Sequence, residues 1–235
     1  MMLRLHTFSL LLLAALTWVV PGIARAQEPL RIVDRPISFS EQRQAMTLAY
    51  MREHYGLEPS DISIVPRMIV LHWTAIETLE ESFRTFDAEH LSGRPDIVGG
   101  GDVNVSIQFL VDRDGTIYRL MPETWMARHV IGLNHVAIGV ENVGTGTPTS
   151  DTLTDAQIEA NARLVRYLAE KYPTIEYLIG HHEYQAFEGH PLWKELDDGY
   201  RTEKIDPGDR FMSAVRARVA DLGLRGAPAA VLPPR

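Results

Sequence analysis

Hydrophobic and polar residues follow each other along this chain in two different spacings. Apolar runs of strand length occupy residues 68–73 (MIVLHW), 103–112, 137–143 and 177–180, and Pro, Gly or Asp residues flank them. Residues 116–121 follow an Arg-Asp-Gly turn, which predicts a hairpin with the strand before it. Runs this short and this apolar are typical of buried strands in a sheet that is covered on both faces.

Helical segments separate these runs. The capping patterns SFSE at 38–41, TLEE at 78–81 and TDAQ at 154–157 predict three helices, which run to about residues 54, 90 and 172. A last helix is expected to begin at Asp209. Helices mixed with strands, together with one hairpin, predict an α/β fold: a single domain with a central mixed β-sheet flanked by helices.

The chain divides into four parts by composition. Residues 1–26 have a weakly basic start, an apolar run and an Ala-Arg-Ala ending, which is typical of a signal peptide cleaved after Ala26. An uncleaved membrane anchor is the alternative, but the apolar run is shorter than the roughly 20 residues that a spanning helix needs. Residues 27–60 are expected to form an N-terminal arm and helix, 61–225 the main domain, and 226–235 a flexible Pro/Ala-rich tail.

Composition and charge exclude several classes of protein. None of the 235 residues is cysteine, which excludes a disulfide-stapled scaffold, a cysteine-based zinc finger and a thiol protease. The formal net charge is −8, and it becomes more negative when the arginines of the signal segment are removed. Nucleic acid is therefore not an expected partner, and no protein partner is indicated. We expect an exported protein, periplasmic or secreted, with no transmembrane span in its mature form.

Three residues form a candidate metal site. His72 and His181 each end an apolar strand, and Asp206 lies in a Lys-Ile-Asp-Pro-Gly segment just before the last helix. Two imidazoles and one carboxylate are a donor set for catalytic zinc, which keeps a fourth position for water. The three residues lie far apart in sequence without a local metal motif, so ordinary strand-end histidines remain the alternative at this point.

The residues around these positions resemble the type-2, peptidoglycan-recognition-protein-like family of N-acetylmuramoyl-L-alanine amidases. The matching blocks occur in the order of that family and cover about residues 65–215. They are IVLHWTA at 69–75, VSIQFLVDRDGTI at 105–117, ARH at 127–129 with Asn134 and AIGVE at 137–141, IGH at 179–181, and KIDPG at 204–208.

This resemblance implies a reaction and a site. His72, His181 and Asp206 would bind one Zn²⁺ per chain, and Glu141 and Lys204 would be catalytic. The fold would be that of the peptidoglycan-recognition-protein-like amidases. The reaction would be hydrolysis of the amide between N-acetylmuramic acid and L-alanine, in peptidoglycan or in muropeptides.

Each implied catalytic role agrees with the chemistry of the residue type. Glu141 interrupts an apolar strand, and as a general base it would take a proton from water and return it to the leaving amine. Lys204 would stabilise the oxyanion with a fixed positive charge. The alternatives are a salt-bridged surface carboxylate and a solvated lysine.

Substrate contacts are expected from His129, Asn134, Arg128 and Trp73. His129 matches the family pattern, with a structural hydrogen-bonding role as the alternative. Arg128 stands where the family has an aromatic residue, so a charge contact would replace stacking. Arg94, Lys194 and Arg201 are further candidate cations for an acidic substrate.

Two other positions depart from the family pattern. Ile107 stands where some relatives have a helper tyrosine, and the segment 183–203 is longer than in related enzymes. That segment could form a wall of the substrate groove or only pack its aromatics down, and its neighbourhood offers His182 and His190 as alternative ligands. Because the chain has no cysteine, Asp206 is the available third ligand, as in the His-His-Asp bacterial branch.

Two further hypotheses remain at this stage. One is a non-catalytic peptidoglycan-binding module of the same fold, and the other is an exported zinc hydrolase that acts on a different amide. Binding-only relatives lose metal ligands, whereas this sequence keeps the implied ligand set and the glutamate.

Overall fold

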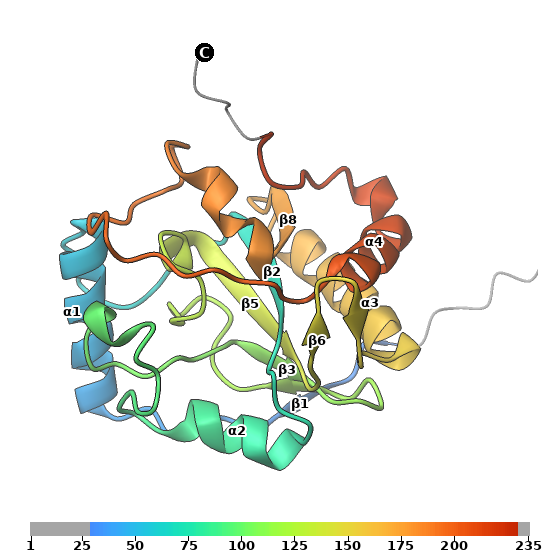
Figure 1. Cartoon of the computed structure of the whole chain (residues 1–235), viewed down its shortest axis with the longest axis horizontal. Coiled ribbons are helices and arrows are strands. Elements are labelled where there is room, and N and C mark those ends of the chain that lie inside the picture. The colour runs from blue at the N-terminus through green and yellow to red at the C-terminus, as the bar shows by residue number, and fades with distance from the viewer. Residues whose placement is uncertain (1–28, 230–235) are drawn as a thin grey trace, which may run out of the picture.

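A mixed sheet of six strands forms the centre of the structure (Figure 1). The computed structural model describes residues 29–229, so the predicted signal segment 1–26 and residues 230–235 of the predicted tail lie outside the described residues. Across the sheet the strands are β1 (Ile32–Asp34), β4 (Ile117–Arg119), β3 (Phe109–Val111), β5 (Ala137–Asn142), β2 (Met68–Trp73) and β8 (Tyr177–Gly180). Only β3 and β4 pair antiparallel, as the predicted hairpin. The other neighbours are parallel, which confirms the α/β fold with a mixed sheet.

Helices cover both faces of this sheet. They are α1 (Glu41–Tyr55), α2 (Leu79–Asp87), α3 (Asp155–Lys171) and α4 (Asp209–Arg218). Thr78 and Thr154 begin α2 and α3 as predicted, with their hydroxyls accepting backbone N–H bonds. The reciprocal bond of a full capping box is present at α3, whereas at α2 the Thr78 hydroxyl donates to the Glu81 carboxylate. For α1 the prediction was wrong by two residues. Ser40 is the N-cap, because the backbone N–H of Ser38 donates to Asp87 and leaves Ser38 in the extended arm.

Strand alternation directs the residues of β2 to two different cores. Ile69 and Leu71 pack against α3 and α4, whereas Met68 and Val70 pack against α1 and the 183–203 segment. Figure 1 shows α3 and α4 on one side of the sheet and α1 on the other. Because successive side chains of a strand point to opposite faces, the next residue, His72, lies on the α1 side of the sheet.

Some short elements differ from the sequence pattern. Strand β3 begins only at Phe109, because the backbone N–H groups of Asn104 and Ser106 donate to Glu89 and Arg128 instead of to a strand partner. Strand β1 lies in the predicted arm and joins the sheet beside β4. A small hairpin of β6 (Gly146–Thr147) and β7 (Ser150–Asp151) was not predicted. Within residues 29–229 no helix has both the length and the apolar character that crossing a membrane requires.

Candidate functional site

The carboxyl ends of β2 and β5 bring two predicted site residues side by side. His72 and Glu141 are direct partners in the parallel register of these strands. Both side chains therefore lie on the same face of the sheet, the face that α1 and the 183–203 segment border. His181 follows the end of β8, the neighbour of β2 on its other side.

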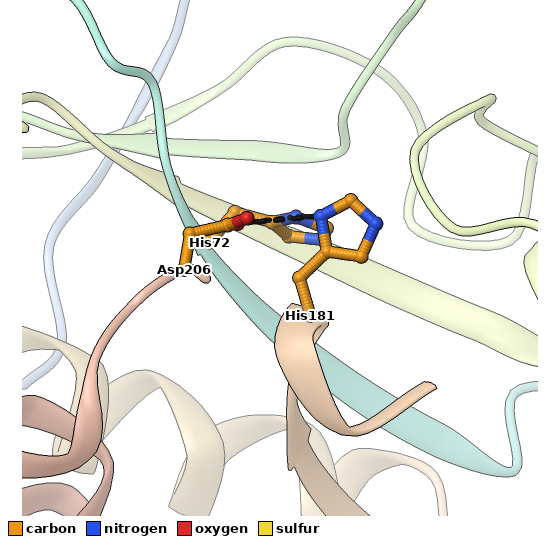
Figure 2. A group of neighbouring side chains, drawn as sticks. All are labelled: His72, His181 and Asp206. Carbon is orange, nitrogen blue, oxygen red and sulfur yellow. Dashed lines mark hydrogen bonds and ion pairs between the residues drawn. The ribbon is translucent and has the colours of Figure 1, made fainter. Parts of the chain in front are cut away.

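The side chains of His72, His181 and Asp206 converge on one point (Figure 2). The Nδ1 atoms of the two histidines are 2.9 Å apart, and each lies 3.3 Å from Oδ2 of Asp206. All three residues are buried, with 8% or less of their surface exposed. The sequence separated these residues widely, but three chain segments bring them together.

This triangle has the dimensions of a zinc site. Zinc bonds of 2.0–2.1 Å in tetrahedral geometry place ligand atoms about 3.3 Å apart, close to the three observed separations. Two facing imidazole nitrogens and a carboxylate oxygen also suit zinc chemically. Within residues 29–229 this is the one group of three or more such side chains that could hold a metal ion. The alternative ligands His182 and His190 do not belong to it.

Burial and charge set the protonation of the triad. Burial lowers the pKa of His181 to about 4, against the attraction of Asp206. Burial alone would raise the pKa of Asp206, but His181 and His72 hold it well below its usual range. A neutral imidazole and an ionised carboxylate are the forms that bind a metal ion.

Glu141 and Lys204 line the same cleft as the triad. Burial, together with the charge of Asp206, raises the pKa of Glu141 well above its usual range, and its Oε2 is buried without a hydrogen-bond partner. Burial and the neighbouring Arg94 lower the pKa of Lys204. The structure therefore places a carboxylate and an ammonium group, each tuned by burial, beside the candidate metal site.

The cleft itself has a volume of about 440 Å³. Its floor is the sheet face that carries His72 and Glu141, and its walls come from the loop that contains Arg94 and Ile97 and from the segment that contains Tyr200. A cleft of this size suits a ligand with several functional groups. It combines an open space, a candidate metal site and the buried carboxyl group of Glu141.

Comparison with protein families gives one match that covers most of the chain. The Amidase_2 family, described as N-acetylmuramoyl-L-alanine amidase, matches residues 47–209. The chain belongs to the Amidase_2 family. A comparison with curated proteins gives no match.

Solved structures similar to this Amidase_2 chain include bacterial and human proteins. One is the amidase LysCS from Clostridium intestinale, with 20% identity, a TM-score of 0.48, and coverage of 83% of this chain and 97% of that one. Another is AmiD from E. coli in complex with a muropeptide substrate, with 19% identity, a TM-score of 0.45, and coverage of 72% and 61%. A third is human PGRP-IBETAC with a muramyl pentapeptide, with 20% identity, a TM-score of 0.42, and coverage of 66% and 87%.

In this Amidase_2 chain Arg128 supports a wall of the cleft. It is 3% exposed, and its guanidinium donates to the carbonyls of Ile97, Gly101 and Val103 and to the Tyr200 hydroxyl. These bonds occupy both terminal nitrogens. The charge that replaces the aromatic residue of the family pattern therefore holds the 97–103 loop in place.

Two other predicted substrate residues make hydrogen bonds or packing contacts within the protein. Asn134 is fully buried, accepts from the backbone N–H groups of His129 and Val130, and donates to the Tyr55 hydroxyl. Trp73 lines the cleft but is 7% exposed. Gly146 leaves room for its ring, since a Cβ there would lie only 2.7 Å from Trp73 Cζ3.

The structure also explains the long 183–203 segment. Tyr184, Phe187 and Tyr200 are buried in the core beneath α1, and Trp193 stacks on Tyr184 with ring centroids 6.1 Å apart. The aromatics thus pack the segment down, while Tyr200 also lines the cleft.

One cleft-side residue was not predicted from the sequence. Asp96 receives two bonds of 2.9 Å from Arg94, and one of its oxygens lies 3.8 Å from Lys204 Nζ. It stands in a glycine-rich stretch where no pattern distinguishes it. Only the fold shows that Asp96 links Arg94 and Lys204, two cations that line the cleft.

Proposed function

We propose that this protein is a zinc-dependent N-acetylmuramoyl-L-alanine amidase. The observation that carries the proposal is the converging His72, His181 and Asp206 group in a chain that belongs to the Amidase_2 family. The substrate is peptidoglycan or a muropeptide, and one Zn²⁺ is bound per chain. The cleaved bond is the amide between N-acetylmuramic acid and L-alanine.

The chain's own residues divide the work of the reaction. When bound, zinc supplies a Lewis acid and lowers the pKa of a water molecule to about 7. Glu141 accepts the proton of the attacking water and returns it to the leaving amine, a task that its raised pKa favours. Lys204 places a positive charge near the oxyanion that forms when the carbonyl is attacked.

Substrate recognition depends on local positive charge. The whole chain is acidic, and stem peptides carry carboxylates, so long-range attraction cannot steer the substrate to the cleft. Arg94 and Lys204 are cations that line it. We propose that Arg94 exchanges part of its pairing with Asp96 for a carboxylate of the stem peptide.

The test combines metal analysis with a cleavage assay. Purified protein is loaded with zinc, its metal content is measured, and it is incubated with soluble muropeptides and with intact sacculi. The expected result is one zinc per chain and release of stem peptides that begin with L-alanine. Zinc-loaded protein that binds muropeptides without cleaving them would instead establish the binding module.

We further propose that the protein acts outside the cytoplasm. The apolar run within residues 1–26 and its Ala-Arg-Ala ending support export with cleavage after Ala26. Mass spectrometry of the protein from its native host should find Gln27 as the first residue, in the periplasmic or secreted fraction. A chain that keeps residues 1–26 in the membrane fraction would support the uncleaved anchor.

A further inference from the structure

A second histidine contacts the ring of His72 from the side opposite the metal site. His72 Nε2 lies 3.0 Å from Nδ1 of His129, and the two rings meet edge to face at 83°, with centroids 5.1 Å apart. The other nitrogen of His72, Nδ1, belongs to the triangle with His181 and Asp206. Both ring nitrogens of His72 therefore have a defined neighbour.

The metal side of the ring fixes the direction of this hydrogen bond. A neutral imidazole carries one proton, and a nitrogen that gives its lone pair to a metal ion cannot hold that proton. If His72 Nδ1 binds the ion, its Nε2 carries the hydrogen and donates it. His129 Nδ1 must then be the acceptor.

We propose that His129 is a positioning residue for the metal site, which accepts the Nε2 proton of His72 and so holds the ring with Nδ1 facing the ion. The proposal rests on the zinc site of the proposed function and not on the amidase reaction. Metal-bound histidines commonly donate their second N–H to a carboxylate, a backbone carbonyl or water, and this partner fixes the tautomer and ring orientation. Here a second imidazole takes that place.

The surroundings hold the His129 ring where this bond needs it. Its backbone N–H donates to Asn134 Oδ1 at 2.8 Å, which fixes the main chain at this point. Gly139 of β5 leaves the space that the ring occupies, because a Cβ there would lie only 2.8 Å from His129 Nδ1. The position of the ring is therefore built into the packing around β5.

The same geometry argues against a direct contact between His129 and the substrate. Its Nδ1 is engaged by His72, and its Nε2, which then carries the proton of the neutral ring, is buried without a hydrogen-bond partner. Neither nitrogen is open to a ligand in the cleft. Among the roles that the sequence left open for His129, the geometry favours the structural hydrogen bond, directed to the metal site.

A matched pair of variants tests the proposal. His129→Asn puts an oxygen acceptor at the position of Nδ1. His129→Leu introduces a side chain of nearly the same shape as asparagine but without an acceptor. We expect His129→Leu to weaken zinc binding about 10- to 100-fold, the usual loss for such a partner, and His129→Asn to stay within about threefold of the parent. Zinc affinity is measured by competition with a chromophoric chelator, and His190→Leu serves as a control because His190 is not in the metal group.

A spectroscopic measurement separates positioning from general stability. In long-range ¹H–¹⁵N spectra of the zinc-loaded parent, His72 should carry its proton on Nε2, with slow exchange that His129→Asn keeps and His129→Leu loses. If His129→Leu does not fold, the proposal is tested by the tautomer of His72 in the zinc-loaded parent alone. A proton on Nδ1 of His72 would overturn the proposal. Equal zinc affinities in the Leu and Asn variants also overturn it.

The outcomes for the reaction are distinct from these. If the parent protein binds no zinc, the zinc site is excluded, and the positioning role of His129 is excluded with it. A parent that binds zinc and responds to His129→Leu as expected, but cleaves no muropeptide, removes only the amidase function.

Discussion

Glu141 lies where burial and the charge of Asp206 both oppose its ionisation. Arg94 and Lys204 act in the opposite direction, and a bound divalent cation would add to their effect. A proton acceptor that must later act as a donor works best when its pKa is near the working pH. In the proposed reaction these surroundings would favour proton transfer by Glu141, whose Oε2 is buried without a hydrogen-bond partner.

Removing the charge of this carboxylate should separate metal binding from turnover. Glu141→Gln keeps the size of the side chain but cannot accept a proton, so kcat should fall about 10²- to 10⁴-fold while zinc content stays at one per chain. Muropeptide turnover and metal analysis on the same sample check this. Unchanged turnover would exclude Glu141 as the general base.

The pairing of Arg94 with Asp96 leads to a prediction about substrate binding. Arg94→Gln should raise KM for muropeptides with free stem carboxylates about tenfold, with a smaller change in kcat, because a charge-assisted hydrogen bond is lost. Arg201→Gln is the matched control. Arg201 was a candidate cation in the sequence, but its side chain pairs with Glu188 and does not line the cleft. An equal KM in the two variants would contradict a role for Arg94 in recognition.

Among the elements, the 97–103 loop depends on one buried side chain. Its carbonyls at Ile97, Gly101 and Val103 all accept hydrogen bonds from Arg128, and the Ile97 carbonyl also accepts from the backbone N–H of Gly100. Buried carbonyls without a partner are costly, so this guanidinium holds the wall of the cleft in one conformation. Arg128, a predicted substrate residue, thus lines the cleft and also holds its wall in place through hydrogen bonds.

Replacing Arg128 should loosen that wall. Arg128→Leu removes the side-chain bonds to the three loop carbonyls and leaves those of Gly101 and Val103 without this donor, so the free energy of unfolding should fall by about 3 kcal/mol. Urea unfolding measures this loss, and hydrogen exchange should show faster exchange at residues 97–103. Arg218→Leu, at an exposed ion pair of α4, should change stability by less than about 0.5 kcal/mol.

For the whole molecule, buried histidine outside the metal site makes stability depend on pH. His135 is 8% exposed, and its ring packs against that of Tyr55 with the ring centroids 4.9 Å apart. Burial, with a smaller contribution from Lys194, lowers its pKa to about 4 from the usual 6.5. Between these two values the unfolded chain binds a proton that the folded chain does not, so stability falls as the pH falls.

This difference predicts the effect of removing the group. When the pH is lowered from 7 to 5, His135 should reduce the free energy of unfolding of the parent protein by about 2 kcal/mol. The His135→Gln variant should not show this part of the decrease. Urea titrations of both proteins at the two pH values give the comparison. Parallel pH profiles would show that His135 is not responsible.

The metal site should also contribute to the stability of the whole chain. An ion that binds the folded state stabilises it by mass action, so each tenfold rise in free zinc above Kd should add about 1.4 kcal/mol. For a domain of this size, that corresponds to a rise in Tm of about 4 °C. Thermal unfolding with buffered zinc or EDTA tests this, and the Asp206→Ala variant should show no zinc dependence.

Much of the fold could be predicted because local patterns agree with the tertiary structure. Strands β2 and β8 have the predicted bounds, and the Thr154 capping box begins α3 as predicted. The short β3 and the N-cap at Ser40 could not be predicted. Both depend on distant hydrogen bonds, from residue 104 to Glu89 and from Ser38 to Asp87, which override the local pattern.

The sequence by itself determined the chemistry of this protein: which side chains can bind a metal ion, which can transfer a proton, and that no cysteine takes part. Only the tertiary structure decided the rest. The 2.9–3.3 Å spacing of the ligand atoms, the support of a loop by Arg128 and the bond between His72 and His129 arise where distant segments meet. No local pattern encodes such contacts, because they depend on how the sheet, the loops and the two cores pack together.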